Sequence, residues 1–510
     1  MSFHFEFPVL RRLPPRKGNC NTRIAFLSCR MGRFRLFHTA PDCNGRSHTL
    51  TKPENVFGGV VMKIWYVRDL EPIPGDPGSP RLLRAGMLAT RLAALGHQTT
   101  WFTSSFNHYS KRQRNAGLLQ ANENLSIEVL PAPGYVRNIS IRRLHHNRRF
   151  AQEFLRRAAA ANELPDVLVA DLPTPEAAAA AVAFAQEKQI PTVVTIRDLW
   201  PDFFAHFVPQ PLRPVARLPI WYLDRQTRYT CRNATSLVGI SDQYLEWGRK
   251  KGGRPRLAQD RVFPLGYLRP HLPKSYDSDR TLRGLGINPD RHIISFVGSW
   301  GATYDLPLVL ETARLLAHRT DINFVLVGNS AERPSLAREF GELNNVHVLG
   351  WRGQHEIAAL LSKTAIGLLP YAQNAPQGLP NKIYEYMAYG AFQLATLSGE
   401  AENFFREMGT GRCVPNINPS HFAKAIEEAL ADRRVIEGRD ERIAIFKTYF
   451  DANKIYRDIA AHIVGVAQRF RSHGSCPSFG TSVPHRLGAG SFPDYQATLI
   501  EKACEGPHLR

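Results

Sequence analysis

The sequence is poor in cysteine, and its few cysteines follow no binding or bridging pattern. Seven occur in 510 residues, and no two have the C-x-x-C spacing of zinc or redox sites. This distribution excludes a disulfide framework and favours a reducing compartment. Five lie near the ends and two in the body of the chain, namely Cys20, Cys29, Cys43, Cys476 and Cys504, then Cys231 and Cys413.

Two further absences narrow the class of protein. No run of about 18 apolar residues occurs, so the sequence predicts no membrane-spanning helix. No G-x-G-x-x-G follows an apolar strand, which argues against a nicotinamide-dependent enzyme. The D-x-D of residues 277–279 has no buried strand before it, so we do not interpret it as a metal–nucleotide site. We therefore expect no metal and no cofactor.

Acidic residues are also scarce relative to basic ones. The chain has 65 Lys and Arg against 45 Asp and Glu, a formal charge of +20 and a pI of about 9.9. This surplus favours anionic partners such as nucleotides, nucleic acid or an acidic membrane face. No RNP, zinc-finger or helix-turn-helix signal is present, so no specific nucleic acid is expected.

Two segments concentrate basic and apolar side chains, residues 137–157 and 213–228. They predict basic amphipathic helices that lie on an anionic bilayer or hold a lipid-diphosphate acceptor. The alternative is a solvated arginine face above an ordinary core stripe. We expect a cytoplasmic protein that attaches peripherally to the inner face of the membrane.

The length predicts two or three domains. From Met62 onward, short apolar strands alternate with helical stretches, which is typical of doubly wound parallel sheets. We predict an α/β fold of two Rossmann-like domains that face a central cleft, with the substrate in that cleft. The predicted parts are a disordered or mis-called extension (1–61), a first domain (62–266), a linker (267–290), a second domain (291–450), a helix that packs back on the first domain (451–470) and a disordered tail (471–510).

The stretch G-L-P-N-K-I-Y-E-Y-M-A-Y-G over residues 378–390 predicts a turn that opens a short helix. Pro380 ends the turn, and we expect Asn381 to cap the helix with its side-chain oxygen. Lys382 and Glu385 are three residues apart and therefore share one face. With the free N–H groups of the first turn, they suit a ligand that carries a phosphate and a vicinal diol. The alternative is a surface ion pair.

A second loop with a possible phosphate-binding role follows an apolar strand at residues 293–297. Gly298, Ser299 and Gly301 would let the backbone approach a diphosphate at the start of a helix. Gly328 and Asn329 form a turn after the next strand. Such glycine loops are weak signals by themselves, because tight turns explain most of them.

The second half resembles the nucleotide-sugar lobe of the retaining GT-B glycosyltransferases of family 4, the group 1 transferases. The match is E-Y-M-A-Y-G from Glu385 to Gly390, and the form P-N-K-x-x-E-Y resembles the WbuB-like branch. That branch adds N-acetylated deoxyamino sugars in bacterial surface-polysaccharide assembly. The family's first motif glutamate falls on Gln377, which departs from the pattern and leaves the role of that position open.

The first half is similar to the same branch. R-D-L-W-P from Arg197 follows a strand at residues 193–196, and the resemblance places Asp198 where the acceptor or the transferred sugar sits. Asp198 would orient a hydroxyl group; alternatively it is a helix cap. Arg197 would pair with phosphate, or else with Asp198 or Asp202. Gly78, Arg81 and His108 are further acceptor or phosphate candidates, although His108 is more often a loop or core histidine.

The resemblance implies transfer of a hexosyl or N-acetylhexosaminyl group, with retention, from a nucleotide-diphosphate sugar of the UDP type. The acceptor is a glycan or a polyprenyl-diphosphate-linked sugar of a bacterial surface polysaccharide. Asp198, Lys382 and Glu385 would carry the chemistry. A nucleotide-sugar epimerase or a sugar phosphorylase on the same fold, and a non-enzymatic polyanion-binding protein, are the alternatives. The implied donor-binding residues are Gly298, Ser299, Gly301, Gly328, Asn329, Asn381, Lys382 and Glu385.

Overall fold

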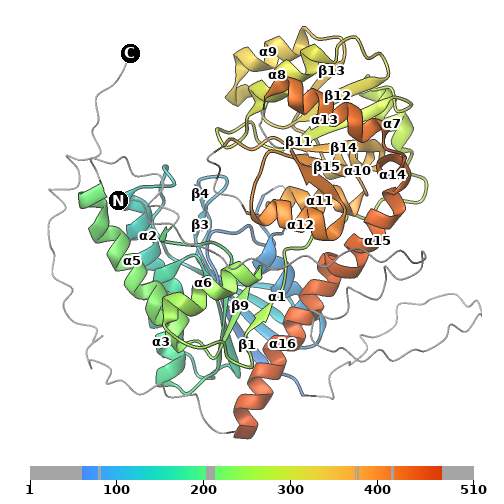
Figure 1. Ribbon diagram of the computed structural model, residues 1–510. Coiled ribbons are helices and arrows are strands. Elements are labelled where there is room, and N and C mark those ends of the chain that lie inside the picture. Colours follow the sequence, from blue (N-terminus) through green and yellow to red (C-terminus); the bar gives the residue numbers. More distant parts are fainter. Residues whose placement is uncertain are drawn as a thin grey trace, which may run out of the picture. The chain divides into compact units, whose positions relative to one another are not determined.

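The computed structural model describes residues 60–77, 82–202, 213–373, 375, 378–414 and 418–473, with the backbone alone at 213–218 and 473. Within these ranges the chain forms two parallel sheets with helices on both faces (Figure 1). The predicted α/β fold of two Rossmann-like domains is confirmed. In the described ranges, none of the helices combines the length and apolar character needed to cross a membrane.

The first lobe is built on a sheet with the strand order β10-β9-β8-β7-β1-β2-β6-β5. Its central strands are buried on both sides, which is why most of their residues are apolar. Only β5 runs antiparallel, paired with β6. The strands are β1 (Lys63–Val67), β2 (Gln98–Ser104), β5 (Gly117–Asn122), β6 (Leu125–Leu130), β7 (Val167–Leu172), β8 (Thr192–Ile196), β9 (Ser236–Gly239) and β10 (Arg261–Val262), with a separate hairpin of β3 (Phe106–Asn107) and β4 (Arg112–Gln113).

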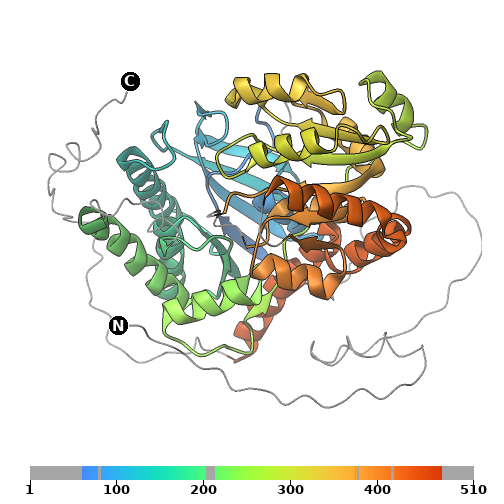
Figure 2. The ribbon, with the colours of Figure 1, turned by 45° about the horizontal axis from the view of Figure 1, so that its top comes forward.

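Helices cover this first sheet on both faces. Helices α2 and α3 share one apolar core with the sheet and α6, and α5 packs on α3 and α6. Helix α1 and the C-terminal helix α16 share the core of the other face (Figure 1, Figure 2). The bounds are α1 (Arg84–Ala94), α2 (Ile141–Ala159), α3 (Pro175–Glu187), α5 (Arg213–Asn233), α6 (Asp242–Gly252) and α16 (Ala452–His473).

The second lobe has a six-stranded parallel sheet of order β13-β12-β11-β14-β15-β16. The chain moves outward from β11 in one direction and then restarts at β14 on its other side, so a topological switch point lies between these two strands. Ligands of open parallel sheets bind beyond the carboxyl ends of the strands at such a point. The strands are β11 (His292–Val297), β12 (Ile322–Val327), β13 (Val346–Gly350), β14 (Thr364–Leu369), β15 (Phe392–Ala395) and β16 (Gly411–Cys413).

The helices of the second lobe surround this sheet. Two apolar clusters, one on each face, hold the sheet and its helices together. The bounds are α7 (Ser278–Gly284), α8 (Leu306–Leu315), η2 (Ser330–Glu332), α9 (Pro334–Gly341), α10 (Gln354–Lys363), α11 (Asn381–Ala388), α12 (Glu400–Met408), α13 (Pro419–Ala431), α14 (Arg433–Glu437) and α15 (Arg439–Tyr449).

The long helix α16 belongs to the first lobe although it follows the second in sequence. Ile455, Ile459 and Ile463 are buried in the same core as Leu88 of α1. His462 makes a 2.9 Å hydrogen bond between its Nε2 and the Oγ of Ser236 at the start of β9. The chain therefore crosses from the second lobe back to the first, as in the predicted packing of residues 451–470.

The structure corrects several expectations about local structure. Residues 267–290 are not only a linker, because α7 lies within them and Leu282 and Ile287 are buried in the second lobe's core. The D-x-D there is used otherwise, since Asp277 caps α7 and Asp279 pairs with Lys363 at 2.8 Å. The antiparallel edge strand and the hairpin gave no sequence signal strong enough to be predicted.

Candidate functional site

Helix α11 is fixed to the switch point of the second lobe by one tyrosine. The Tyr386 hydroxyl accepts a hydrogen bond from the Val297 N–H at 3.2 Å and donates to the Ser295 carbonyl at 3.1 Å. Its ring packs on Gly367 of β14, where an added Cβ would lie 2.6 Å from the ring. The tyrosine thus reaches between β11 and β14 and sets the start of α11 at the carboxyl ends of these strands.

Lys382, in the first turn of α11, lies directly over Gly298 at the end of β11. A Cβ added to Gly298 would lie 1.9 Å from the Lys382 ammonium nitrogen. That nitrogen is 5.5 Å from the centre of the Phe296 ring and 5.2 Å from that of Tyr304. These aromatic faces stabilise the cation. Across the ranges that the structure describes, no carboxylate pairs with it, so the charge remains available for an anion.

In the second glycine turn, the backbone of Gly328 lies directly against the backbone of Gly298. Gly328, at the end of β12, has a φ of +146°, and a Cβ there would lie 1.8 Å from the carbonyl oxygen of Gly298. The Gly298 N–H donates to the Val327 carbonyl at 2.9 Å. Only glycine fits this approach. The two turns therefore form one continuous backbone surface beside the Lys382 ammonium.

Glu385 lies one helical turn beyond Lys382 and, like it, is half-buried. The expected capping role of Asn381 is wrong. The cap residue of α11 is Pro380, and Asn381 is the exposed first residue of the helix, with no side-chain bond to the helix start. Proline has no side-chain acceptor, so no side chain caps the first N–H groups of α11. These groups point out of the N-terminal end of the helix, where Lys382 lies.

The remaining donor-loop residues have separate positions. Ser299 is exposed, Trp300 is fully buried, and the Gly301 carbonyl accepts a 3.0 Å hydrogen bond from Arg333. The loop continues to α8, which begins at Leu306 with Asp305 as its cap. Asn329 precedes η2, and its amide donates to Glu332 at 3.5 Å.

In the first lobe, Arg197 is held in a buried ion-pair network. Its guanidinium lies 2.6 Å from Glu71 and 2.7 Å from Asp171, and Arg68 contacts the same two carboxylates. Burial by itself lowers the pKa of Arg197, but Glu71 and Asp171 outweigh it and the pKa is raised. The predicted pairing with Asp198 or Asp202 is wrong; Asp202 instead accepts from Trp247 and Lys251.

Asp198 follows β8 and is half-buried. Its carboxylate accepts a 3.2 Å hydrogen bond from the Leu199 N–H and another from the Trp200 side chain. Burial raises the pKa of Asp198 above its ordinary value. A half-buried carboxyl with a raised pKa at the carboxyl end of a parallel strand is suited to exchange a proton with a hydroxyl group.

His108, after the hairpin strand β3, is half-buried, and its Nδ1 lies 2.6 Å from the Tyr135 hydroxyl. Burial, with Lys111 and Arg143 nearby, lowers the pKa of His108 to about 4. The imidazole is therefore neutral near pH 7. Of the other candidates, Gly78, Arg81 and Gln377 lie outside the described residues. Where side chains are described, no three His, Cys, Asp or Glu residues gather as a metal site would require.

Sequence reasoning missed several polar groups at the same edge of the first lobe. Arg84 is 5 % exposed, and its Nη2 has no hydrogen-bond partner in the described ranges. Asp69 lies 3.5 Å from His146, and Glu176 is fully buried. Burial raises the pKa of Glu176 to about 8. These residues are far apart in the chain and share no motif, so only the fold shows that they lie at one edge of the sheet.

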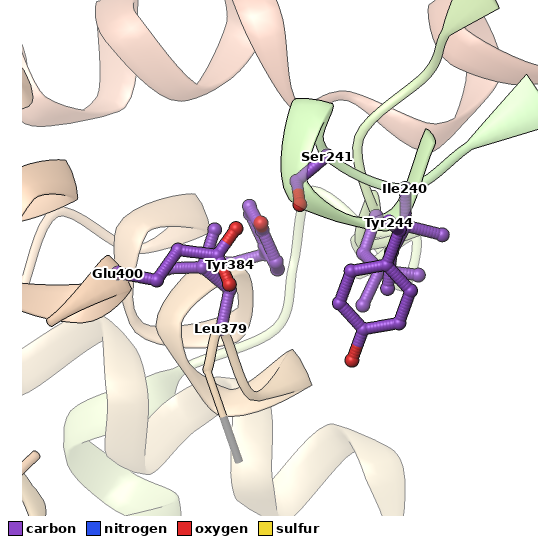
Figure 3. Close-up of a pocket in the computed structure, with 7 residues that line it drawn as sticks. Ile240, Ser241, Tyr244, Leu379, Tyr384 and Glu400 are labelled. Atoms are coloured by element: carbon purple, nitrogen blue, oxygen red, sulfur yellow. The ribbon is translucent and has the colours of Figure 1, made fainter. Parts of the chain in front are cut away.

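A small cavity lies between the β9–α6 turn and helices α11 and α12 (Figure 3). Ser241 and Tyr244 come from the first element, and Tyr384 and Glu400 from the helices. Its volume is about 10 Å³, which is room for no more than one water molecule. The cavity is therefore a packing gap beside α11 and not a substrate pocket.

Comparisons with known proteins agree with this architecture. Residues 83–266 match the model of the glycosyl transferase 4-like domain, and residues 291–432 match the model of the glycosyl transferases group 1. Among curated protein sequences, none matches.

Solved structures with a similar fold share little sequence identity with this chain. The sucrose-phosphate synthase of Thermosynechococcus elongatus is 18 % identical, with a TM-score of 0.57, over 81 % of this chain and all of that one. HepE of Anabaena, solved with UDP and glucose, is 16 % identical with a TM-score of 0.52, over 79 % and 100 %. WaaG, a glycosyltransferase involved in lipopolysaccharide biosynthesis, is 15 % identical with a TM-score of 0.54, over 79 % and 100 %. The two family matches, one in each lobe of this GT-B fold, support a group 1 glycosyltransferase.

Proposed function

We propose that this protein transfers a sugar from a nucleotide-diphosphate sugar of the UDP type to a glycan or a polyprenyl-diphosphate-linked acceptor, with retention of the anomeric configuration. The fold similarity to HepE, solved with UDP and with UDP-glucose, supports a donor of this kind. The motif P-N-K-x-x-E-Y supports an N-acetylhexosaminyl or hexosyl donor used in bacterial surface-polysaccharide assembly.

The observation that carries the proposal is the position of Lys382. Its ammonium lies over the Gly298 backbone, at the switch point of a parallel sheet, and has no carboxylate partner among the described residues. A diphosphate there would meet the ammonium, the backbone of two glycine turns and the uncapped start of α11. Few other ligands need all three features together.

In the proposed reaction, the bond between the sugar's anomeric carbon and the diphosphate oxygen breaks, and its electron pair leaves with the diphosphate. Lys382 stabilises this growing negative charge, a role worth about 3 kcal/mol for one donor in comparable sites. Glu385 accepts hydrogen bonds from the ribose hydroxyls and so positions the donor. The acceptor hydroxyl, oriented by Asp198, forms the new bond to the anomeric carbon and passes its proton to the oxygen of the leaving diphosphate. No metal or other cofactor takes part.

The proposed acceptor and the basic surface support peripheral attachment of the enzyme to the cytoplasmic face of a membrane. The exposed arginines of α2 outnumber the acidic residues of that helix, so the helix carries a net positive charge. An anionic lipid surface attracts such a helix, and the attraction weakens as salt rises.

The test is a panel of UDP-, GDP- and TDP-sugars, measured by protection against thermal unfolding and by sugar transfer. We expect a UDP-sugar to protect, and we expect Lys382→Ala and Glu385→Gln each to reduce transfer tenfold or more without loss of fold. Lys363→Ala, which removes a lysine paired with Asp279 in the same lobe, is the matched control and should leave transfer unchanged.

Two outcomes would contradict the proposal. Near-normal transfer in both site variants would remove the site assignment. Formation of an isomer from the donor alone, with no acceptor added, would identify an epimerase instead.

A further inference from the structure

Two cations of the first lobe converge on one loop beside His108. Lys111 donates from its ammonium to the Asn138 side-chain oxygen at 2.7 Å, and Arg143 donates to the Asn138 carbonyl at 2.7 Å. Both also lie over the ring of Tyr135, the ammonium 4.8 Å and the guanidinium carbon 5.6 Å from its centre. One aromatic face and one asparagine therefore hold two positive charges together.

Neither cation is neutralised by a salt bridge among the described residues. The Nε of Arg143 is buried and lacks a hydrogen-bond partner there. The nearby acidic groups have other roles. Asp69 accepts a 2.6 Å hydrogen bond from Thr174 and lies 3.5 Å from His146. Since burial raises the pKa of Glu176 to about 8, that side chain is largely uncharged at neutral pH. The pair therefore keeps an excess of positive charge.

This cationic pair is connected to Asp198 through one residue. The guanidinium of Arg143 stacks on the Trp200 ring, 4.5 Å from its centre. Trp200 also hydrogen-bonds the Asp198 carboxylate. The pair consequently lies next to the carboxyl group that, in the proposed function, meets the acceptor hydroxyl.

An exposed apolar surface adjoins the pair. Val136 is 75 % exposed, Ile139 65 % and Ile141 44 %, and Tyr109 on the neighbouring loop is 61 % exposed. Exposed side chains of this size within six residues are unusual for a surface that faces only water. Arg137 lies among them and is exposed as well. Apolar groups beside arginine favour a ligand that combines a lipid chain with an anionic head.

We propose that Lys111 and Arg143 bind the diphosphate of a prenyl-diphosphate-linked acceptor, and that residues 136–141 and Tyr109 contact its prenyl chain. This inference rests on the proposed function and names the acceptor class of that site. A diphosphate needs at least two cations at close range, and the guanidinium forms paired hydrogen bonds with phosphate oxygens. The attached sugar would then extend past Trp200 toward Asp198.

The test measures binding of three probes in detergent micelles by calorimetry. The probes are geranylgeranyl diphosphate, geranylgeraniol and inorganic pyrophosphate. We expect the native protein to bind the prenyl diphosphate at least tenfold more tightly than either of the other two. Arg143→Gln and Lys111→Gln should each weaken its binding about tenfold. Val136→Ser with Ile139→Ser should weaken the prenyl diphosphate but leave pyrophosphate unchanged.

Matched controls separate a specific site from surface charge. Arg142→Gln removes the same charge from the neighbouring, exposed position of α2, and Leu164→Ser removes an exposed apolar side chain elsewhere in the first lobe. Both should bind the prenyl diphosphate within twofold of the native protein. Equal losses in Arg142→Gln and Arg143→Gln would overturn the inference in favour of general electrostatic attraction. Pyrophosphate binding as tight as that of the prenyl diphosphate would overturn the lipid contact.

UDP binding, measured on the same variants, distinguishes the two proposals. If UDP binds in a Lys382-dependent manner while Arg143→Gln binds the prenyl diphosphate normally, only the acceptor inference fails. If no nucleotide binds, the proposed function itself fails. The melting temperature of each variant confirms that a loss of binding is not a loss of fold.

Discussion

The carboxyl edges of the two sheets differ in what fills them. In the first lobe, Arg68, Glu71, Asp171 and Arg197 pair with one another at the carboxyl ends of β1, β7 and β8 and are buried or nearly so. In the second lobe, the same topological position holds two glycine turns and Lys382, which has no carboxylate partner in the described ranges. At the same position in the fold, the charged residues of the first lobe bind one another, whereas the Lys382 charge of the second lobe is available to a ligand.

This contrast distinguishes charged residues that stabilise the fold from charged residues that are available to bind a ligand. A buried ion with its counter-ions adds little net stability, but removing one partner leaves the other unpaired at high cost. A half-buried cation over aromatic rings adds little to folding and is free to bind an anion. The first lobe's network should therefore respond to mutation in stability, and the second lobe's lysine in activity.

The largest expected effect comes from the same substitution at both positions. Arg197→Met should lower the free energy of unfolding by about 3–5 kcal/mol, because Glu71 and Asp171 then share Arg68 as their remaining counter-ion. Lys382→Met should change it by no more than about 0.5 kcal/mol while reducing transfer tenfold or more. Denaturant unfolding and a transfer assay measure the two quantities. Equal losses of stability would abolish the distinction drawn between the lobes.

The second expected effect concerns the first lobe's buried carboxyl. Glu176 keeps its proton in the folded state up to about pH 8, whereas the unfolded side chain ionises near its ordinary pKa of 4.5. The unfolded state therefore binds fewer protons between these values, and stability falls as pH rises through this window. Glu176→Gln should remove this fall and so stabilise the protein by up to about 5 kcal/mol at pH 9 and little at pH 4. Urea unfolding at several pH values tests this, and a pH-independent difference would contradict it.

The third expected effect sharpens the description of the second lobe's edge. Gly328→Ala places a Cβ against the Gly298 carbonyl and forces a φ of +146° on alanine, so it should destabilise by about 1–3 kcal/mol. Gly284→Ala in α7, where a Cβ meets nothing within 4 Å, is the control and should stabilise slightly. Thermal unfolding distinguishes them. Similar melting temperatures for the two variants would mean that the close backbone approach is absent.

The smallest expected effect is a difference in stability between cap variants of two helices in the second lobe, α8 and α11. Asp305→Ala should cost about 1 kcal/mol, because Asp305 accepts a 3.1 Å hydrogen bond from the Leu308 N–H at the start of α8. Asn381→Ala should cost no more than a few tenths of that, since Asn381 does not cap α11. Guanidinium unfolding of both variants measures the difference. A larger loss for Asn381→Ala would restore the capping role that its sequence position suggested.

Local patterns in the sequence predicted the architecture and part of the site. Short, mostly apolar runs such as residues 193–196 predicted buried parallel strands, because a strand covered on both faces buries nearly all of its side chains. The spacing of Lys382 and Glu385 placed them on one face, since helical geometry alone fixes that relation. These inferences need only neighbours in the chain.

Tertiary structure alone decided which partners the charged residues have. The sequence proposed Asp198 or Asp202 for Arg197, because both are near in the chain; the fold supplied Glu71, 126 residues away. Likewise, no pattern joined Lys111 and Arg143 to Asn138, or placed the Lys382 ammonium over Gly298. Contacts between distant strands and helices depend on how each sheet is assembled, and no local periodicity encodes that assembly.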